Sequence, residues 1–171
     1  SLRVAGVAAG LGEIGRSKLF LSKRFGPRNR MFAIYTDAVL DADPLVPPGT
    51  ICDNCGLCNR ACPADAVAGQ RECKIRIGPY EYSHAPLDVA RCSVVHRGYD
   101  RRYSPFVTAE NSEANPPDYY KFLDGRFRHH GICAGRGCVR ACMDHLEETG
   151  RIEQCSHQTP MIEGDQWVLE E

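Results

Sequence analysis

The 171-residue sequence lacks a long apolar run, a strong net charge and an internal repeat. A membrane-spanning helix needs roughly 18 apolar residues in a row, and no stretch of this chain reaches that length. The formal net charge is -1, so the chain has no excess of positive charge that would attract it to nucleic acid. The first residues, "SLRVAGVAAG", hold one cation and too short an apolar stretch for a signal peptide. We therefore expect a cytoplasmic protein with no membrane span and no nucleic-acid partner.

Cysteine, in contrast, is abundant, with ten residues in the chain. Cysteines of small secreted proteins usually form disulfides, but here no export signal accompanies them and they cluster at short spacings. Clustered thiols in such a setting are typical of metal binding. We treat metal ligation as the leading interpretation and disulfides or free thiols as the alternatives.

The stretch "CDNCGLCNRACP" (52–63) contains a C-x2-C-x2-C-x3-C-P pattern. In this pattern three cysteines bind one cubane [4Fe–4S] cluster, while the fourth cysteine binds a second cluster. Zinc is the alternative, yet a tetrahedral zinc site usually draws on two well-separated pairs of cysteines. The motif predicts two [4Fe–4S] clusters, with Cys62 serving a different cluster from Cys52, Cys55 and Cys58.

A second stretch, "CAGRGCVRAC" (133–142), resembles a reversed copy of the ending of the first motif. By the same interlocking logic its last cysteine returns to the first cluster, and one further ligand must come from the segment between the two motifs. Cys92 is the first candidate for that ligand, and Cys73 is the alternative. The predicted sets are Cys52, Cys55, Cys58 and Cys142 for cluster one, and Cys62, Cys92, Cys133 and Cys138 for cluster two.

Other residues near the motifs have plainer interpretations. We expect Cys73 and Cys155 to be small buried apolar residues. His145, one helical turn after Cys142, is expected to cap or pack its helix. The adjacent His129 and His130 are expected to belong to an exposed loop.

Three zones divide the chain into predicted elements. Residues 1–47 are rich in glycine and apolar residues, with a helical end at 2–11, strands at 18–21 and 31–36, and a turn at 25–27 between the strands. The second strand is apolar on both faces, which predicts an interior strand. A proline-rich connector leads into the cysteine zone, residues 70–117 are expected to form loops, and helices are predicted at 117–123 and at 138–148, the last one ending at Gly150.

Five segments resemble corrinoid-dependent iron–sulfur reductases, the group that includes reductive dehalogenases and epoxyqueuosine reductase. They occur in the family's order over about half of the chain: "AGLGEIGR" (9–16), "FGPRNRM" (25–31), "TDAVL" (36–40), the cluster motif and "LDVARC" (87–92). The resemblance implies an α+β fold: a bacterial ferredoxin-like double-cubane module (48–171) attached to a fragment of a nitroreductase-like α/β domain (1–47). It further implies cobalamin as a second cofactor, carried by that domain or by a corrinoid-binding partner.

Glycines and arginines in the first zone are candidates for contact with that cofactor. Gly10, Gly12 and Gly15 form a G-x-G-x-x-G match without a preceding strand, so we interpret them as points of close backbone approach, to a corrinoid if the resemblance holds. Arg28 and Arg30 belong to an arginine-rich cation set, 17 of 21, that favours fixed contacts with anions. They either bind the corrinoid or pair with acidic neighbours.

The leading function is an electron-transfer module of a corrinoid-dependent reductase. It would receive electrons from a donor protein such as a ferredoxin or flavodoxin. Two alternatives remain at this point: a ferredoxin-like carrier that docks on another redox enzyme, and a protein in which metal only holds a small fold together. Because the sequence begins at Ser1 rather than methionine, we also expect it to be part of a longer protein.

Overall fold

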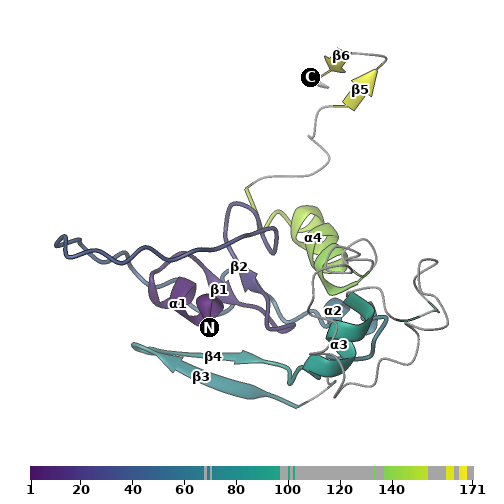
Figure 1. Ribbon diagram of the computed structural model, residues 1–171, viewed down its shortest axis with the longest axis horizontal. Helices are drawn as coiled ribbons and strands as arrows, with labels where there is room; N and C mark the ends of the chain where they lie inside the picture. Colours follow the sequence, from purple (N-terminus) through teal and green to yellow (C-terminus); the bar gives the residue numbers. More distant parts are fainter. Residues whose placement is uncertain are drawn as a thin grey trace, which may run out of the picture.

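A computed structural model describes residues 1–67, 69, 71–96, 100, 102, 133, 137–153, 161–163 and 166–168. Short helices alternate with two-stranded antiparallel sheets (Figure 1), which confirms the α+β class. The elements are α1 (Leu2–Ala8), β1 (Glu13–Ile14), β2 (Phe20–Leu21), α2 (Leu57–Arg60), β3 (Cys73–Ile77), β4 (Tyr80–His84), α3 (Val89–His96), α4 (Cys138–Glu148), β5 (Met161–Glu163) and β6 (Gln166–Val168).

The β1–β2 hairpin lies at the centre of the fold and serves two small hydrophobic cores. Ile14 pairs with Phe20, and both pack with Val7 of α1 and Tyr82 of β4. Neighbouring residues of a strand point to opposite faces. The other face of the hairpin therefore carries Leu21, which packs against Ile51 and Leu146. One hairpin thus joins α1 and β4 on one side to the cysteine-bearing segments on the other.

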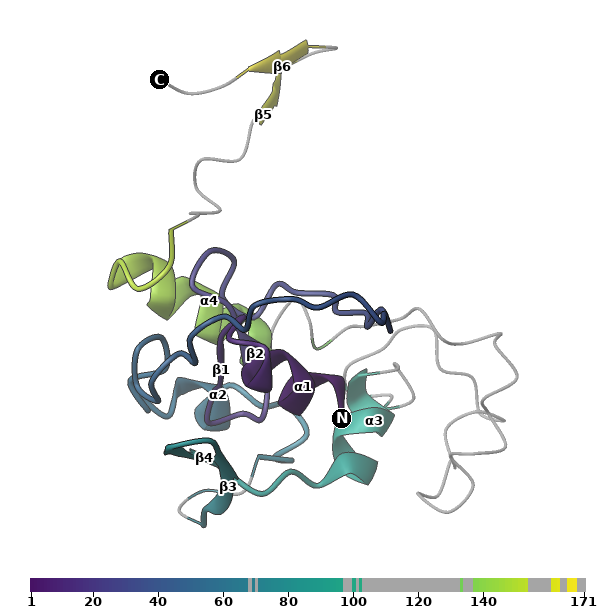
Figure 2. The same ribbon diagram turned by 90° about the vertical axis from the view of Figure 1, so that its left-hand side faces the viewer.

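Helix α4 packs against α2, and the two helices lie side by side in both views (Figures 1 and 2). Met143 and Leu146 are its buried residues, and they recur at a spacing that places them on one face of a helix. The chain leaves the helix through Gly150, whose φ of 64° is the left-handed conformation that favours glycine. The predicted helix 138–148 is confirmed, together with its end at this glycine.

The predicted loops of residues 70–117 are partly wrong, because the described part of this region contains a hairpin and a helix. Strands β3 and β4 pair in register from Cys73 opposite His84 to Ile77 opposite Tyr80, around a turn at Gly78 with φ of 55°. Ile75, Ile77 and Tyr80 pack on the core around Val7. Helix α3 follows the hairpin directly. The alternation of apolar residues along β3 and β4 was the signal for these strands.

The predicted interior strand at 31–36 is also wrong. These residues form no strand, and the segment from 31 to 40 extends away from the rest of the chain and returns in a long loop (Figures 1 and 2). Phe32, Ile34 and Tyr35 are 81%, 78% and 96% exposed. Met31 packs against the core around Val7, but the residues from Phe32 to Thr36 are exposed and pair with no strand among the described residues. The turn at 25–27 is present, with Gly26 at φ of 58° and bridged to Ser22.

The remaining predictions of secondary structure have mixed outcomes. Helix α1 confirms the predicted helix near the start, and β2 confirms the end of the strand predicted at 18–21, whose first residue, Lys18, is in a turn with φ of 64°. The helix predicted at 117–123 and the pair His129 and His130 lie outside the described residues. Within the described residues, no helix is both long and apolar enough to cross a membrane.

Candidate metal centres

Four cysteines from distant parts of the sequence line one cavity. Cys52, Cys55 and Cys58 come from the loop before α2 and its first turn, and Cys142 comes from α4. Gly15, Arg16 and Ser17 of the β1–β2 turn line the same cavity. The four cysteines are the set predicted for cluster one. We call this space the first cavity.

The loop before α2 needs two residues in the left-handed backbone conformation. Asn54 has φ of 61° and Gly56 has φ of 74°, and asparagine and glycine are the residues that adopt this conformation most easily. The Asp53 side chain accepts a hydrogen bond from the Cys55 backbone N–H at 3.2 Å, which forms a local turn. These features bend the chain so that the three thiols face one space.

A second cavity is lined by the other predicted set, Cys62, Cys92, Cys133 and Cys138. Its remaining lining is largely apolar and includes Leu19, Pro63, Ala64, Val67, Leu87 and Val95. Cys73 lines neither cavity: it is exposed on β3, so the expectation that it is buried is wrong, and the structure brings Cys92 rather than Cys73 to this set. Cys155 lies outside the described residues. We call this space the second cavity.

Each of two packed helical segments supplies one cysteine to each cavity. Cys58 lies in α2 and Cys62 just after it, four positions apart, while Cys138 and Cys142 are four positions apart within α4. Cys58 and Cys142 face the first cavity, and Cys62 and Cys138 face the second. A four-residue step along a helix shifts a side chain by about one turn. The contact between α2 and α4 therefore holds the two cavities next to each other.

The thiols are suited to a metal rather than to remaining free anions. Burial, and then the charge of neighbouring cysteines of the same cavity, raises the pKa of Cys133 to about 11 and of Cys138 to about 12. The same causes raise the pKa of Cys142 further, with Cys52 and Cys58 as its nearest charged neighbours. Four thiolates in one buried space repel one another unless a cation neutralises them. The donor set of each cavity, four convergent sulfurs, therefore fits an iron–sulfur cluster or another thiophilic metal.

These shifts predict how the stability of the metal-free protein depends on pH. A thiol whose pKa is raised by folding stabilises the fold below its ordinary pKa of 9.0, and this contribution is lost as the pH rises through the folded value. The melting temperature of the reduced, metal-free protein should fall steadily between about pH 9 and pH 11. Thermal melts in anaerobic buffer would measure it. A Cys133→Ser/Cys138→Ser variant should show a flatter profile, and equal slopes for both proteins would contradict the prediction.

Three hydrogen bonds to cysteine sulfurs were not foreseen from the sequence. The backbone N–H of Arg16 lies 3.4 Å from Cys52 Sγ, and that of Ala66 lies 3.3 Å from Cys62 Sγ. The third joins His96 Nδ1 and Cys133 Sγ at 3.0 Å. Hydrogen bonds to ligand sulfurs raise the potential of an iron–sulfur site. Only backbone geometry and tertiary packing bring these groups together, so no sequence signal marks them.

Glu13 is a buried carboxylate that fixes the start of the cysteine loop. Glu13 is 1% exposed. Its carboxylate accepts hydrogen bonds from the backbone N–H groups of Gly49 at 2.8 Å, Ile51 at 2.7 Å and Cys52. Burial raises the pKa of Glu13, while the same N–H donors act in the opposite direction. Glu13 pairs with Leu21 across the hairpin, so its side chain faces the loop rather than the core around Val7. This residue links the glycine-rich segment to Cys52.

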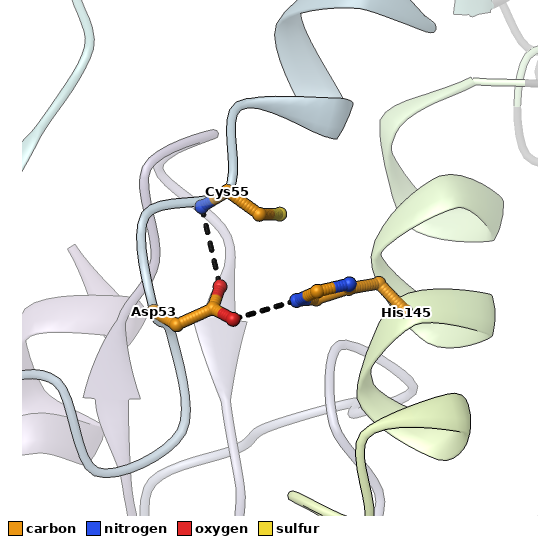
Figure 3. Close-up of side chains that lie close together, drawn as sticks. All are labelled: Asp53, Cys55 and His145. Carbon is orange, nitrogen blue, oxygen red and sulfur yellow. Dashed lines mark hydrogen bonds and ion pairs between the residues drawn. The ribbon is translucent and has the colours of Figure 1, made fainter.

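Asp53 ties the cysteine loop to α4, as Figure 3 shows. One carboxylate oxygen lies 2.7 Å from His145 Nε2 and 3.6 Å from Arg151 Nε. Burial alone would raise the pKa of Asp53, but the hydrogen bond and charge of His145, with Arg151, lower it. His145 is therefore hydrogen-bonded to Asp53 of the cysteine loop, a contact that the expected cap or packing role did not include. Asp53, Cys55 and His145 have ligand atoms within 4.8 Å of one another, but the Asp53 carboxylate is already engaged by two cationic partners.

Loss of the Asp53–His145 hydrogen bond, which joins the cysteine loop to α4 beside the first cavity, should destabilise the fold. His145→Gln removes a charge-assisted hydrogen bond that is partly exposed, and we expect a loss of about 1 kcal/mol in the free energy of unfolding. Chemical denaturation would measure it. Glu148→Gln, an exposed change on the same helix, is the matched control and should leave stability unchanged. A His145→Gln protein as stable as the control would contradict a linking role for this contact.

The predicted cofactor-binding glycines and arginines divide into two groups. Gly10, Arg28 and Arg30 line one open hollow near the turn after β2. Gly12 and Gly15 are elsewhere: a Cβ on Gly12 would clash with the Leu21 carbonyl oxygen, and Gly15 lines the first cavity. Arg28 also lies 3.5 Å from the Glu147 carboxylate, the acidic partner that the sequence left open. Whether any of the five touches a corrinoid stays a prediction.

Two cysteine-lined cavities are typical of metal-binding proteins, and comparison with known proteins relates the chain to oxidoreductases. About half of it is similar to reductive dehalogenases. The tetrachloroethene reductive dehalogenase of Dehalobacter restrictus (strain DSM 9455 / PER-K23) is 38% identical over 97 residues, covering 50% of this chain and 17% of that protein. One from Desulfitobacterium hafniense is 41% identical over 71 residues, covering 40% of this chain and 13% of that protein.

The chain spans less than a fifth of the length of these relatives. No family model matches it, and no solved structure matches it. The partial similarity to reductive dehalogenases indicates a redox role for the chain.

Proposed function

We propose that this chain is the iron–sulfur electron-transfer part of a corrinoid-dependent reductase of the reductive dehalogenase type. Cys52, Cys55, Cys58 and Cys142 would hold one [4Fe–4S] cluster, and Cys62, Cys92, Cys133 and Cys138 would hold the other. When bound, each cluster would supply one-electron transfer at a potential tuned by its surroundings. The protein's own contribution is to bury the thiols, to place N–H donors near their sulfurs and to keep the two sites adjacent.

A single observation carries this proposal: eight cysteines from three separate segments gather in two groups of four around adjacent cavities. The interlocking is specific, because α4 supplies one cysteine to each group, and so does the segment formed by α2 and the two residues after it. A protein that used cysteine only as a small apolar residue would have no reason to alternate cavities along a helix. The proteins that are similar to half of the chain are named as reductive dehalogenases, and a reductive enzyme needs a supply of electrons.

The exposed apolar segment at 31–40 supports the proposal that this chain is part of a larger protein, other parts of which cover the segment. Val39 and Leu40 are 100% and 73% exposed, and together with Phe32, Ile34 and Tyr35 they form an apolar surface that water disfavours. A stand-alone carrier would be expected to cover such a surface. We propose that residues 1–47 belong to a cofactor domain of the nitroreductase-like kind and that residues 48–171 form the two-cluster domain. Cobalamin, if that domain binds it, would approach the hollow lined by Gly10, Arg28 and Arg30.

Metal analysis of anaerobically purified protein tests the proposal. We expect a brown protein with about eight irons and about eight acid-labile sulfides per chain, and electron paramagnetic resonance (EPR) signals of [4Fe–4S] clusters after reduction. A colourless protein with one or two zinc ions would overturn it in favour of a structural metal site. A donor such as reduced ferredoxin or flavodoxin should reduce the clusters, because the proposed function requires an external source of single electrons.

A corrinoid test separates the enzyme from a stand-alone carrier. The full-length protein, expressed with cobalamin in the medium, should keep a corrinoid absorbance after desalting. If the clusters assemble but no corrinoid binds, the carrier interpretation replaces the reductase.

A further inference from the structure

Ser17 is the one described residue that lines both cysteine cavities. It lies in the turn between β1 and β2 and is 6% exposed. Its neighbours divide on either side: Gly15 and Arg16 line the first cavity only, and Leu19 lines the second only. The turn of this hairpin therefore forms part of the wall between the two candidate cluster sites.

The position of Ser17 is fixed by contacts on both sides of it. The Arg16 carbonyl accepts a hydrogen bond from the Ala85 backbone N–H at 2.8 Å, at the end of β4. The Lys18 carbonyl accepts one from Arg3 Nη1 at 2.8 Å, from α1. The turn itself closes through hydrogen bonds between Gly15 and Leu19 and between Lys18 and Gly15. Contacts from α1 and from the residue that follows β4, together with the hydrogen bonds of the turn itself, thus fix the two residues that flank Ser17.

A hydroxyl at this place has a chemical consequence. Burying a hydroxyl is costly unless it forms a hydrogen bond. Thiols and apolar groups make up most of the lining of both cavities, with Arg16, Asp53 and His145 as further polar side chains in the first and Arg3 in the second. Asp53 is the one carboxylate among them, and it is already engaged by His145 and Arg151, so sulfur is the acceptor that each cavity offers once metal is bound. A hydrogen bond to sulfur withdraws negative charge and favours the reduced cluster, which raises the reduction potential.

We propose that Ser17 tunes the reduction potential of the proposed clusters: its hydroxyl, which has one hydrogen to give, donates a hydrogen bond to a sulfur of a cluster bound in one of the two cavities. The inference rests on the proposed function. It goes further by assigning to one side chain, outside the cysteine motifs, control over the reduction potential of at least one of the two clusters. The Arg16 and Ala66 backbone donors each serve one cavity, whereas Ser17 is placed to act on either.

The test compares Ser17→Ala and Ser17→Thr by EPR-monitored redox titration of the full chain. The alanine variant should keep about eight irons, while the reduction equilibrium of at least one cluster falls about tenfold, which is about 59 mV to more negative potential for a one-electron couple. Ser17→Thr retains the hydroxyl and should keep the wild-type potentials. Ser83→Ala, an exposed serine on β4, is the matched control and should change nothing.

Each outcome decides the inference. Loss of iron in Ser17→Ala but not in Ser17→Thr would also support a role for the hydroxyl. Unchanged potentials in a fully loaded Ser17→Ala protein would overturn the inference, and so would equal loss of iron in both variants, since that points to packing alone. A wild-type protein without iron–sulfur clusters would instead overturn the proposed function, so the two failures are distinguishable.

Discussion

Replacing Cys142 with serine is expected to halve the iron content, from about eight to about four atoms per chain. Cys142 faces the first cavity with Cys52, Cys55 and Cys58, so the change removes one of four ligands from that site. The second site keeps all four of its cysteines. Iron analysis together with EPR of the reduced protein would show one cluster type lost and the other retained.

Two further variants show whether the lost iron comes from the first site. Cys138→Ser, one helical turn earlier on α4, should remove the other cluster and spare the first. Cys73→Ser should change nothing, because Cys73 is exposed on β3 and lines neither cavity. If Cys142→Ser abolishes the signal that Cys138→Ser leaves intact, the interlocked assignment holds. If both variants lose the same cluster, the assignment is wrong.

Replacing Glu13 with alanine is expected to destabilise the fold by about 3 kcal/mol. The carboxylate accepts backbone hydrogen bonds from Gly49, Ile51 and Cys52, and leaving a buried N–H without an acceptor costs about 1 kcal/mol or more. Because Cys52 is one of the displaced residues, the first cluster should also be lost at a lower temperature than the second. Chemical denaturation and iron release on heating would measure the two effects.

Two controls separate the acceptor role of Glu13 from its charge and size. Glu13→Gln keeps one acceptor oxygen and should fall between wild type and alanine. Glu81→Ala removes an exposed glutamate of β4 that pairs with Lys74, and it should cost much less. A Glu13→Ala protein as stable as Glu81→Ala would show that the loop does not depend on this carboxylate.

The parts of the fold that follow from local sequence could be predicted. Helix α4 has buried residues at a helical spacing and a glycine at its end, so its bounds agree with the pattern. The segment 31–36 has the composition of an interior strand, yet the pattern of a segment does not reveal whether a partner strand is present. The hairpin of β3 and β4 was missed because its short apolar alternation was interpreted as irregular structure.

The candidate site was predictable where spacing determines it and unpredictable where tertiary contacts do. The cysteine spacing predicted two groups of four, and the structure places the same residues around two cavities, although metal binding itself stays a prediction. The roles of Glu13 and Ser17 could not be predicted from the sequence. Glu13 binds backbone amides 36 and 38 residues away, and Ser17 owes its position to the turn between two strands. The sequence around a glutamate in a glycine-rich segment does not show which backbone N–H groups its side chain will bind.

The position of α4 in the sequence determines when the two sites can be completed during synthesis. The loop with Cys52 to Cys62 leaves the ribosome long before α4 does. The second cavity has its full set of sulfurs only when Cys138 has emerged, and the first only when Cys142 has emerged. The newly made chain therefore exposes unfinished groups of thiols for the time needed to translate some eighty residues. Insertion of metal before Cys133 has emerged would meet three ligands at the first site and two at the second. If the sites hold the proposed clusters, this order of synthesis favours delivery of iron and sulfide after α4 has been made.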